Sequence, residues 1–305
     1  MLEFKKLELS DQGWITPYLN TDGAIMSDRT FASLFIWRDL YDVQICKKDE
    51  FLYFLSKDHN GLRTYYMPLT CSGADLSLAM AEIEADAAQF DQPWQVVLMT
   101  AEGKEALEAA CPGRYTFIDD RDGYDYIYSA EDLRTLKGKK FHAKRNYLNR
   151  FRNLYEGRWE YQAIDPAIHR DMLHAYTIEW GRARSGDGYE EDYIHELEAI
   201  DKALQNFEEL HMRGGLLLVD GKIAAYTLAA VPAPGVIDVL FEKADTSIDG
   251  AYPMINNQFA IHAFDGIELV NREEDMGIEG LRTAKLSYNP VQMTAKYVVL
   301  PGEGC

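Results

Sequence analysis

One stretch in the second half of the chain constrains the fold more than any other. Residues 215–231, "GLLLVDGKIAAYTLAAV", place Asp220–Gly221 between two apolar runs. An Asp-Gly pair readily adopts the positive φ angles of a two-residue turn, so this pattern is the strongest short-range signal of a β-hairpin. A further apolar run, residues 235–245, follows a Pro-Gly turn. The sequence therefore predicts three consecutive antiparallel strands here.

The elements around these strands complete a characteristic order. Asp165 followed by Pro166 is typical of a helix start. The predicted order is a strand (158–164), two helices (165–184 and 189–213, the second closed by Gly214–Gly215), the three strands, a helix (250–264), a strand (267–271), a helix (278–288) and a strand (291–300). This is the element order of the Gcn5-related N-acetyltransferase (GNAT) fold.

The first half shows a looser version of the same order. It predicts a helix over 27–42 with Ser27 as its N-cap, strands over 43–56, 62–69, 94–100, 115–120 and 124–129, and helices over 73–90 and 102–111. We therefore expect an α+β protein of two tandem GNAT-like domains, each a mixed, mostly antiparallel sheet flanked by helices. The expected boundaries are 1–130 for the N-terminal domain, 131–157 for a basic connecting helix region and 158–305 for the C-terminal domain.

Composition limits the possible functions. The 305 residues include 31 Lys and Arg against 50 Asp and Glu, a net charge of -19, which argues against general DNA binding. We see no apolar run long enough for a signal peptide or a transmembrane helix. The four cysteines have neither metal-binding nor redox spacing (Cys46, Cys71, Cys111 and Cys305). The sequence thus predicts a cytoplasmic protein without a metal site.

One segment departs from this acidic background. Between Arg134 and Arg152 the chain has eight Lys and Arg residues and no acid. Residues 142–155 also have helical apolar spacing, with Tyr147, Leu148, Phe151 and Leu154 on one side. We interpret the segment as a site for an anionic ligand such as a phosphate backbone or lipid head group. The residues expected to bind it are Lys139, Lys140, His142, Lys144 and Arg145. The alternative is a solvated face that neutralises nearby acids.

The strand over 235–245 carries two candidate catalytic carboxylates. Asp238 and Glu242 alternate with Val239 and Phe241, so both should point to one face of the sheet. A carboxylate there could act as general base for an attacking amine, or bind a cationic group. The alternative is a solvated strand face.

The loop that follows could hold a donor. A phosphate-bearing molecule would lie at the N-terminus of the helix over 250–264, where free backbone N–H groups bind anions. Gly250 and Ala251 would let it approach, and Asn256 would contribute a polar contact. Asp245 and Asp249 count against coenzyme A. The alternative is an ordinary acidic helix cap.

Residues 271–290 hold the remaining candidates. Arg282, Lys285 and Tyr288 stand three residues apart. Lys285 and Arg282 could hold a phosphate or a developing oxyanion, and Tyr288 could return a proton to a leaving group. A structural salt-bridge network with the acidic run 273–275 is the alternative.

Two motifs resemble a known family. "DYIYSAEDLRTLKGKKFHAKRNYLNRF" and "NREEDMGIEGLRTAKLSYNP" resemble the signature regions of the DUF2156 family, related to the C-terminal catalytic domain of phosphatidylglycerol lysyltransferases. The resemblance implies a tandem GNAT-like fold and transfer of an aminoacyl group from aminoacyl-tRNA to a lipid head group. Catalytic relatives have a Lys-x-Lys-Phe-x-x-Pro-like run. Lys285, Tyr288 and Pro290 match it, but Ser287 stands where the second lysine would be.

Two main functions follow. The first is an acyltransferase or aminoacyltransferase, with aminoacyl-tRNA or acyl-CoA as the possible donor and a lipid or other small molecule as acceptor. The second is a non-catalytic GNAT-fold module that binds a phosphate-bearing metabolite or a lipid head group. A structural protein that binds a partner through an exposed apolar patch is a third alternative. The sequence requires no cofactor beyond a donor.

Overall fold

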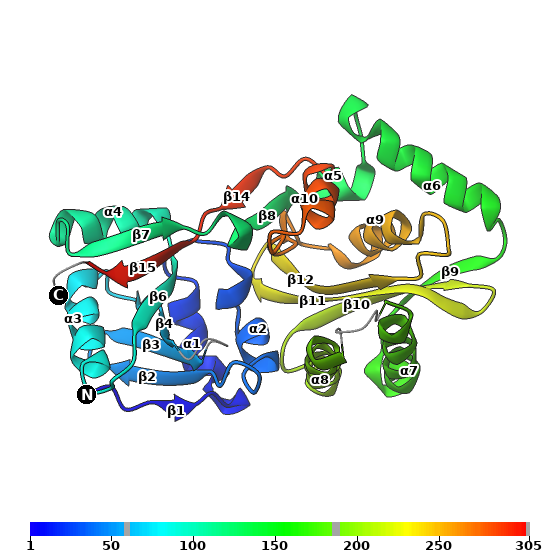
Figure 1. The fold of residues 1–305 in the computed structure, drawn as a ribbon. Helices are drawn as coiled ribbons and strands as arrows, with labels where there is room; N and C mark the ends of the chain where they lie inside the picture. Colours follow the sequence, from blue (N-terminus) through cyan, green and yellow to red (C-terminus); the bar gives the residue numbers. More distant parts are fainter. Residues whose placement is uncertain (58–61, 185–189, 303–305) are drawn as a thin grey trace. The chain divides into compact units, whose positions relative to one another are not determined.

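The computed structural model describes residues 1–57, 62–184 and 190–302. The chain divides into two compact units (Figure 1). Unit 1 consists of Met1–Asp125, Glu274–Ile278 and the residues from Met293 onward, and unit 2 consists of Tyr126–Glu273 and Glu279–Gln292. None of the helices in the described ranges is both long and apolar enough to span a bilayer.

Unit 1 is built on a mixed sheet. Its strands are β1 (Lys5–Lys6), β2 (Gln44–Lys48), β3 (Phe51–Lys57), β4 (Arg63–Tyr66), β5 (Leu69–Thr70), β6 (Trp94–Met99), β7 (Tyr115–Asp119) and β15 (Tyr297–Pro301). Within the described residues the order is β1-β2-β3-β4-β6-β15-β7, with β5 paired to β3. The β4–β6 pair is parallel. The helices of this unit are α1 (Gln12–Leu19), α2 (Phe31–Ile36), α3 (Leu76–Ala87) and α4 (Ala101–Ala110).

The core of unit 1 explains how these elements pack. Apolar residues of α3, such as Met80 and Ile83, share one buried cluster with Tyr53, Tyr65 and Val96 of the sheet. Six of the seven residues of β3 are buried, so both faces of this strand are covered. The predicted N-cap of α2 is wrong. The cap is Thr30, whose side chain accepts from the Ser33 N–H, while Ser27 binds the Asp125 carboxylate through its backbone N–H and its hydroxyl.

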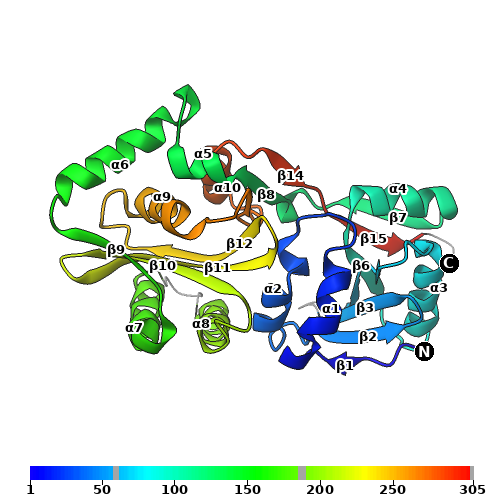
Figure 2. The same cartoon turned by 180° about the vertical axis from the view of Figure 1, so that it is seen from behind.

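Unit 2 is built on a second mixed sheet. The strands of this sheet are β8 (Asp125–Ser129), β9 (Trp159–Ala163), β10 (Met212–Val219), β11 (Lys222–Ala233), β12 (Val236–Ala244), β13 (Leu269–Asn271) and β14 (Gln292–Thr294). The first residue of β8 and the last two residues of β14 belong to unit 1. Its helices are α5 (Ala130–Thr135), α6 (His142–Leu154), α7 (Pro166–Arg184), α8 (Glu190–Gln205), α9 (Ala251–Ala263) and α10 (Glu279–Leu286). Helix α9 covers one face of the sheet, and α7 and α8 cover the other (Figures 1 and 2).

The predicted hairpin at the centre of unit 2 is confirmed. Val219 pairs with Lys222 around Asp220–Gly221, and β12 continues the antiparallel meander. The second predicted helix ends earlier than expected, at Gln205. Residues 206–211 form turns, and the His211 backbone has a φ of 52°, which the helix cannot continue through. Tyr189, the predicted start, lies outside the described residues.

Each sheet contains one strand from the other half of the chain. Strand β15 lies between β6 and β7, while β8 lies between β13 and β14 within the described residues. The predicted single strand over 291–300 is therefore two strands that join different sheets. The compact units consequently differ from the expected linear boundaries at 130/131 and 157/158. Backbone pairing explains the difference, because a strand joins whichever sheet edge satisfies its N–H and C=O groups.

Candidate functional site

Charged side chains from α6, β12 and the end of β13 gather around one tyrosine in unit 2. The Nζ of Lys144 lies 3.8 Å from the centre of the Tyr288 ring. The Cζ of Arg272 lies 5.1 Å from the same ring centre. Glu242 completes the group through its Oε1, 2.9 Å from Nη2 of Arg272. We call Lys144, Glu242, Arg272 and Tyr288 the cation cluster.

The carboxylate of the cation cluster is fixed on both oxygens. Asn256 of α9 donates from Nδ2 to Oε2 of Glu242 at 3.3 Å, while Arg272 binds the other oxygen. The amide oxygen of Asn256 is buried and has no hydrogen-bond partner among the described residues. A buried acceptor without a partner costs free energy, so a ligand donor that reached it would be favoured.

A buried lysine supports the cation cluster from behind. Lys285, in the last turn of α10, donates from Nζ to the backbone oxygen of Arg272 at 2.5 Å. The hydroxyl of Tyr128 in turn donates to the backbone oxygen of Lys285 at 2.9 Å. These bonds tie α10 to β8 and to the residue after β13. Lys285 therefore positions Arg272, a contact different from the donor contact predicted for it.

The surroundings of the cation cluster shift the pKa values of Lys144 and Tyr288. Burial, together with the positive charge of Arg272, lowers the pKa of Lys144 to about 8, although Glu242 opposes the change. Burial raises the pKa of the Tyr288 hydroxyl, so this residue keeps its proton at neutral pH. An amine with a pKa near neutrality can both accept and return a proton. Two cations also face one carboxylate, which favours an anionic group.

Lys144 contacts Ser287, the position at which the family motif would have its second lysine. Its Nζ donates to the Ser287 hydroxyl at 2.6 Å. Ser287 stands where the resemblance places a second lysine, and α6 supplies an amine at that point. The structure thus brings together four residues predicted as separate candidates: Lys144, Glu242, Asn256 and Tyr288.

The other basic residues of the segment have different surroundings. Lys140 pairs with Asp132 at 2.7 Å. Arg145 donates to the backbone oxygens of Leu136 and Gly138, the latter at 2.7 Å, and so caps the end of α5. Lys139 and His142 are exposed, and the His142 ring lies 3.3 Å from the side-chain nitrogen of Asn146.

The predicted apolar face of α6 is only partly buried. Leu148 and Phe151 are buried as predicted, whereas Tyr147 and Leu154 are exposed.

The N-terminus of α9 packs against α6. A Cβ added at Gly250 would lie 3.2 Å from both the Cβ of Phe151 and the backbone oxygen of Tyr147. Ala251 is buried, and Asp249 pairs with Arg150 of α6. Gly250 therefore allows a close approach between two helices. This differs from the predicted approach of a ligand to the same backbone.

Asp238 and Glu242 lie on opposite faces of β12, so the prediction of a shared face is wrong. Asp238 lies opposite Ala230 of β11, and Glu242 lies opposite Thr227. Directly opposed residues share a face, and these two partners are three residues apart, which puts them on different faces. The cause is a bulge at Leu240, where the register shifts. Asp238 is fully buried. Arg282, on α10, is partly exposed.

Unit 1 holds a group of carboxylates spaced as metal ligands are. Oxygens of Asp28, Asp125 and Glu274 all lie within 4.8 Å of one another. The ammonium of Lys296 also lies among them, bound to Asp28 and, at 3.1 Å, to Asp125. A lysine in this position neutralises the charge that a cation would neutralise. The ammonium of Lys296 therefore offsets one of the negative charges of this set of oxygen ligands.

Sequence reasoning missed two residues of the site. Arg272 and Tyr128 come from the two motifs, but neither was singled out. Arg272 directly follows β13, which pairs in parallel with β12. The sequence did contain a signal for Arg272, because a residue that directly follows β13 lies next to the strand that carries Glu242. Tyr128 carried no such signal, because its contact with α10 spans 157 residues.

Comparison with known proteins shows which proteins this chain resembles. A family model described as "Phosphatidylglycerol lysyltransferase, C-terminal" matches residues 24–300. A conserved protein of unknown function from Bacteroides thetaiotaomicron VPI-5482 is 40% identical, with 99% of this chain and 100% of that chain covered and a TM-score of 0.90. A curated relative, the uncharacterized protein MYCGA3080 of Mycoplasmoides gallisepticum, is 24% identical over 177 residues. That match spans 57% of this chain and only 55% of the relative.

Two more distant structures show the fold. L-PGS from Bacillus licheniformis is 17% identical, with 97% of this chain and 93% of that chain covered and a TM-score of 0.62. A tandem GNAT protein from the clavulanic acid biosynthesis pathway is 11% identical, with both chains fully covered (100%) and a TM-score of 0.53. These similarities confirm the predicted α+β fold of two tandem GNAT-like units. The family model that matches residues 24–300 confirms the family that the two motifs resemble.

Proposed function

The chain belongs to the phosphatidylglycerol lysyltransferase C-terminal family, and from this premise we propose that it is an acyltransferase that works at the cation cluster of unit 2. The finer proposal is that it transfers an aminoacyl group from aminoacyl-tRNA to the hydroxyl of a lipid head group or of another small acceptor. The observation that carries the proposal is the placement of Lys144, with a pKa near 8, beside Arg272 around Tyr288.

The proposed reaction assigns each residue a step. The neutral amine of Lys144 takes the proton from the acceptor hydroxyl as its oxygen attacks the ester carbonyl of the donor. Arg272 stabilises the oxyanion that develops on that carbonyl oxygen. The bond between the carbonyl carbon and the donor oxygen then breaks, and the proton returns from Lys144 to the leaving oxygen. Lysine is thus regenerated, and one ester is exchanged for another.

The remaining residues position these two cations. Glu242 holds the guanidinium of Arg272, and Lys285 holds its backbone. The ring of Tyr288 lies beside both cations and shields them from water, which strengthens their electrostatic effect. The free amide oxygen of Asn256 would accept a hydrogen bond from the acceptor. Lys139, exposed on the same segment, would contact the donor's phosphates.

The test is a transfer assay with matched donors. The full chain is incubated with tRNA charged with labelled lysine or alanine, together with phosphatidylglycerol vesicles, and label in the lipid fraction is measured. Parallel reactions use acetyl-CoA with the same vesicles, and aminoacyl-tRNA with glycerol phosphate. Label in the lipid from aminoacyl-tRNA supports the finer proposal, whereas label from acetyl-CoA supports only acyl transfer. Absence of transfer in every arm contradicts both, and leaves the non-catalytic binding module.

A further inference from the structure

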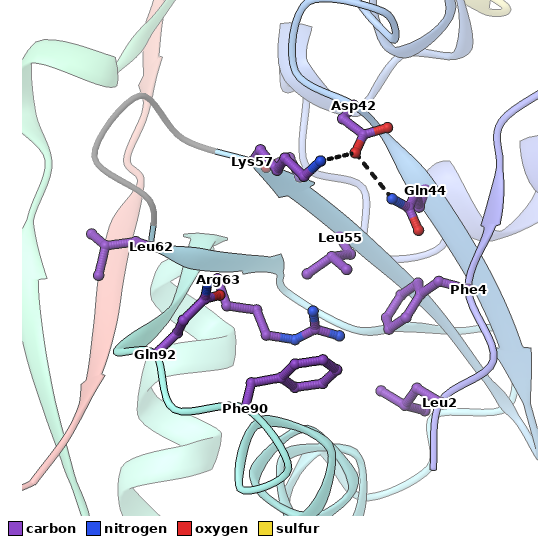
Figure 3. A pocket seen from close by; sticks show the side chains of 11 residues that line it. Leu2, Phe4, Asp42, Gln44, Leu55, Lys57, Leu62, Arg63, Phe90 and Gln92 are labelled. Carbon is purple, nitrogen blue, oxygen red and sulfur yellow. Dashed lines mark hydrogen bonds and ion pairs between the residues drawn. The ribbon is translucent and has the colours of Figure 1, made fainter.

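A pocket in unit 1 presents an arginine together with apolar walls. It has a volume of about 390 Å³, near the lower end of the range for small-molecule sites. Figure 3 shows Arg63 reaching across it between Leu55 and Phe90, with Phe4 beside the guanidinium. The pocket lies at the start of β4 and beyond the C-terminal end of α3. It is independent of the cation cluster and of the function proposed above.

The arginine is held rigidly from behind. Its Nε donates to the Tyr65 hydroxyl at 2.6 Å, and its Nη2 donates to Asp86 at 2.7 Å. Asp86 is itself buried and also accepts from the Tyr65 hydroxyl and the Leu2 N–H. A guanidinium fixed in this way is preorganised, so little entropy is lost when it binds a ligand.

One nitrogen of the guanidinium remains available. The Nη1 of Arg63 has no hydrogen-bond partner among the described residues, and its two N–H groups suit a carboxylate. The Cζ of Arg63 lies 3.9 Å from the centre of the Phe90 ring. Phe90 is 44% exposed, although a ring of this size normally gains from burial. A flat apolar group entering the pocket would cover part of this ring.

The opposite edge of the pocket offers acceptors. Oδ2 of Asp42 binds Lys57 at 2.8 Å and Gln44 at 3.2 Å. Its other carboxylate oxygen and the amide oxygen of Gln44 are acceptors that could take N–H groups of a ligand. Figure 3 places Asp42 and Gln44 on the far side of Leu55 from Arg63.

We propose that this pocket binds a small zwitterion with a flat apolar body, the chemistry of a free aromatic α-amino acid. Its carboxylate binds Nη1 of Arg63, and its ammonium binds Asp42 and Gln44. Its ring packs against Phe90, Phe4 and Leu55. The lining carries two positive charges (Arg63, Lys57), balanced by Asp86 and Asp42. A ligand with no net charge that carries one ammonium and one carboxylate matches this arrangement better than an anion or a cation.

The test is isothermal titration of the full chain with L-tryptophan and L-phenylalanine. We expect a dissociation constant of about 1 mM or lower. N-acetyl-L-tryptophan lacks the ammonium, L-tryptophanamide lacks the carboxylate, and indole lacks both, so each should bind more weakly by at least about fivefold. Binding of the three analogues as tight as that of L-tryptophan would overturn the assignment to a zwitterion. So would the absence of heat with both amino acids up to about 10 mM.

Two variants locate the binding site. Phe90→Ala removes a half-exposed ring and should weaken L-tryptophan binding by about fivefold or more. Arg63→Lys keeps the charge that pairs with Asp86 but removes Nη1, and should weaken binding to a similar extent. Ile118→Ala, another exposed apolar residue of unit 1, is the control and should bind as the unchanged protein does. Unchanged binding in both pocket variants would place the ligand elsewhere and refute the proposal.

Discussion

A single amine is the residue on which the proposed chemistry depends. Lys144 lies in the first turn of α6, within the basic segment from Arg134 to Arg152, and most of the other cations of this segment form structural contacts. Lys140 forms an ion pair, and Arg145 binds backbone oxygens. The net charge of the segment predicted an anion site, but only the packing around Tyr288 distinguishes Lys144 from its neighbours. A depressed pKa arises from burial and a nearby cation, neither of which is visible in sequence.

The pH dependence of turnover tests this residue. A general base must be neutral, so the rate should rise with pH and level off above about 8. Glu242→Gln removes a charge that raises the pKa of Lys144, so the midpoint should fall by several tenths of a pH unit or more. The measurement is transfer rate against pH for both proteins. Glu268→Gln, an exposed acid of the same unit, is the control. A midpoint that Glu242→Gln leaves in place contradicts the assignment.

At the scale of elements, periodicity predicted most helices and strands but not their irregularities. The hairpin at Asp220–Gly221 and the helix α9 are as expected. The bulge at Leu240 was missed because apolar residues fill both faces of β12, which removes the alternation that would reveal a shift. The bulge matters for the site, since it turns the Glu242 carboxylate and the Asp238 carboxylate to different faces.

The contact between α6 and α9 gives a prediction for Gly250. This residue has a φ of 82°, and a Cβ there would lie 3.2 Å from two atoms of α6. Gly157 has a φ of 68° and open space around it, so Gly157→Ala measures the backbone cost alone. That cost is about 1 kcal/mol. Gly250→Ala should lose about 1 kcal/mol more, measured by urea unfolding. Equal losses in the two variants would show that the helices do not pack as described.

At the scale of the whole molecule, the sequence did not predict that each sheet contains a strand from the other half of the chain. The element order indicated two GNAT-like halves, which the related structures confirm. Residues 291–300 read as one strand, yet β14 and β15 join different sheets. Pairing partners more than a hundred residues apart leave no local pattern. The boundaries of a unit therefore depended on contacts that only the folded chain shows.

A buried charge group in unit 1 gives a prediction for stability. Burial and the nearby Asp28 raise the pKa of Glu274 to about 7, with Lys296 opposing and Asp125 adding to the effect. The folded state therefore holds a proton that the unfolded state loses near pH 4.5. The Glu274 contribution to the free energy of unfolding should fall as pH rises from about 4.5 to about 7, and then stay constant.

The variant Glu274→Gln isolates this contribution. It cannot ionise, so its stability relative to the unchanged protein should rise between about pH 5 and about pH 8, by on the order of 2 kcal/mol. Urea unfolding of the full chain at the two pH values measures the difference. Glu108→Gln, at an exposed position of α4, is the control and should show no such change. A Glu274→Gln difference that is independent of pH contradicts the buried protonated carboxyl.

The most direct test of the central claim, that unit 2 transfers acyl groups through Lys144, is the turnover of Lys144→Met. Methionine fills the space of the lysine chain but has no amine. Lys222→Met, at the exposed first residue of β11 in the same unit, is the matched control. We predict that transfer from aminoacyl-tRNA falls by about 100-fold or more in Lys144→Met. The circular dichroism spectrum should stay unchanged, and Lys222→Met should keep full activity. A Lys144→Met protein that transfers at the unchanged rate contradicts the account.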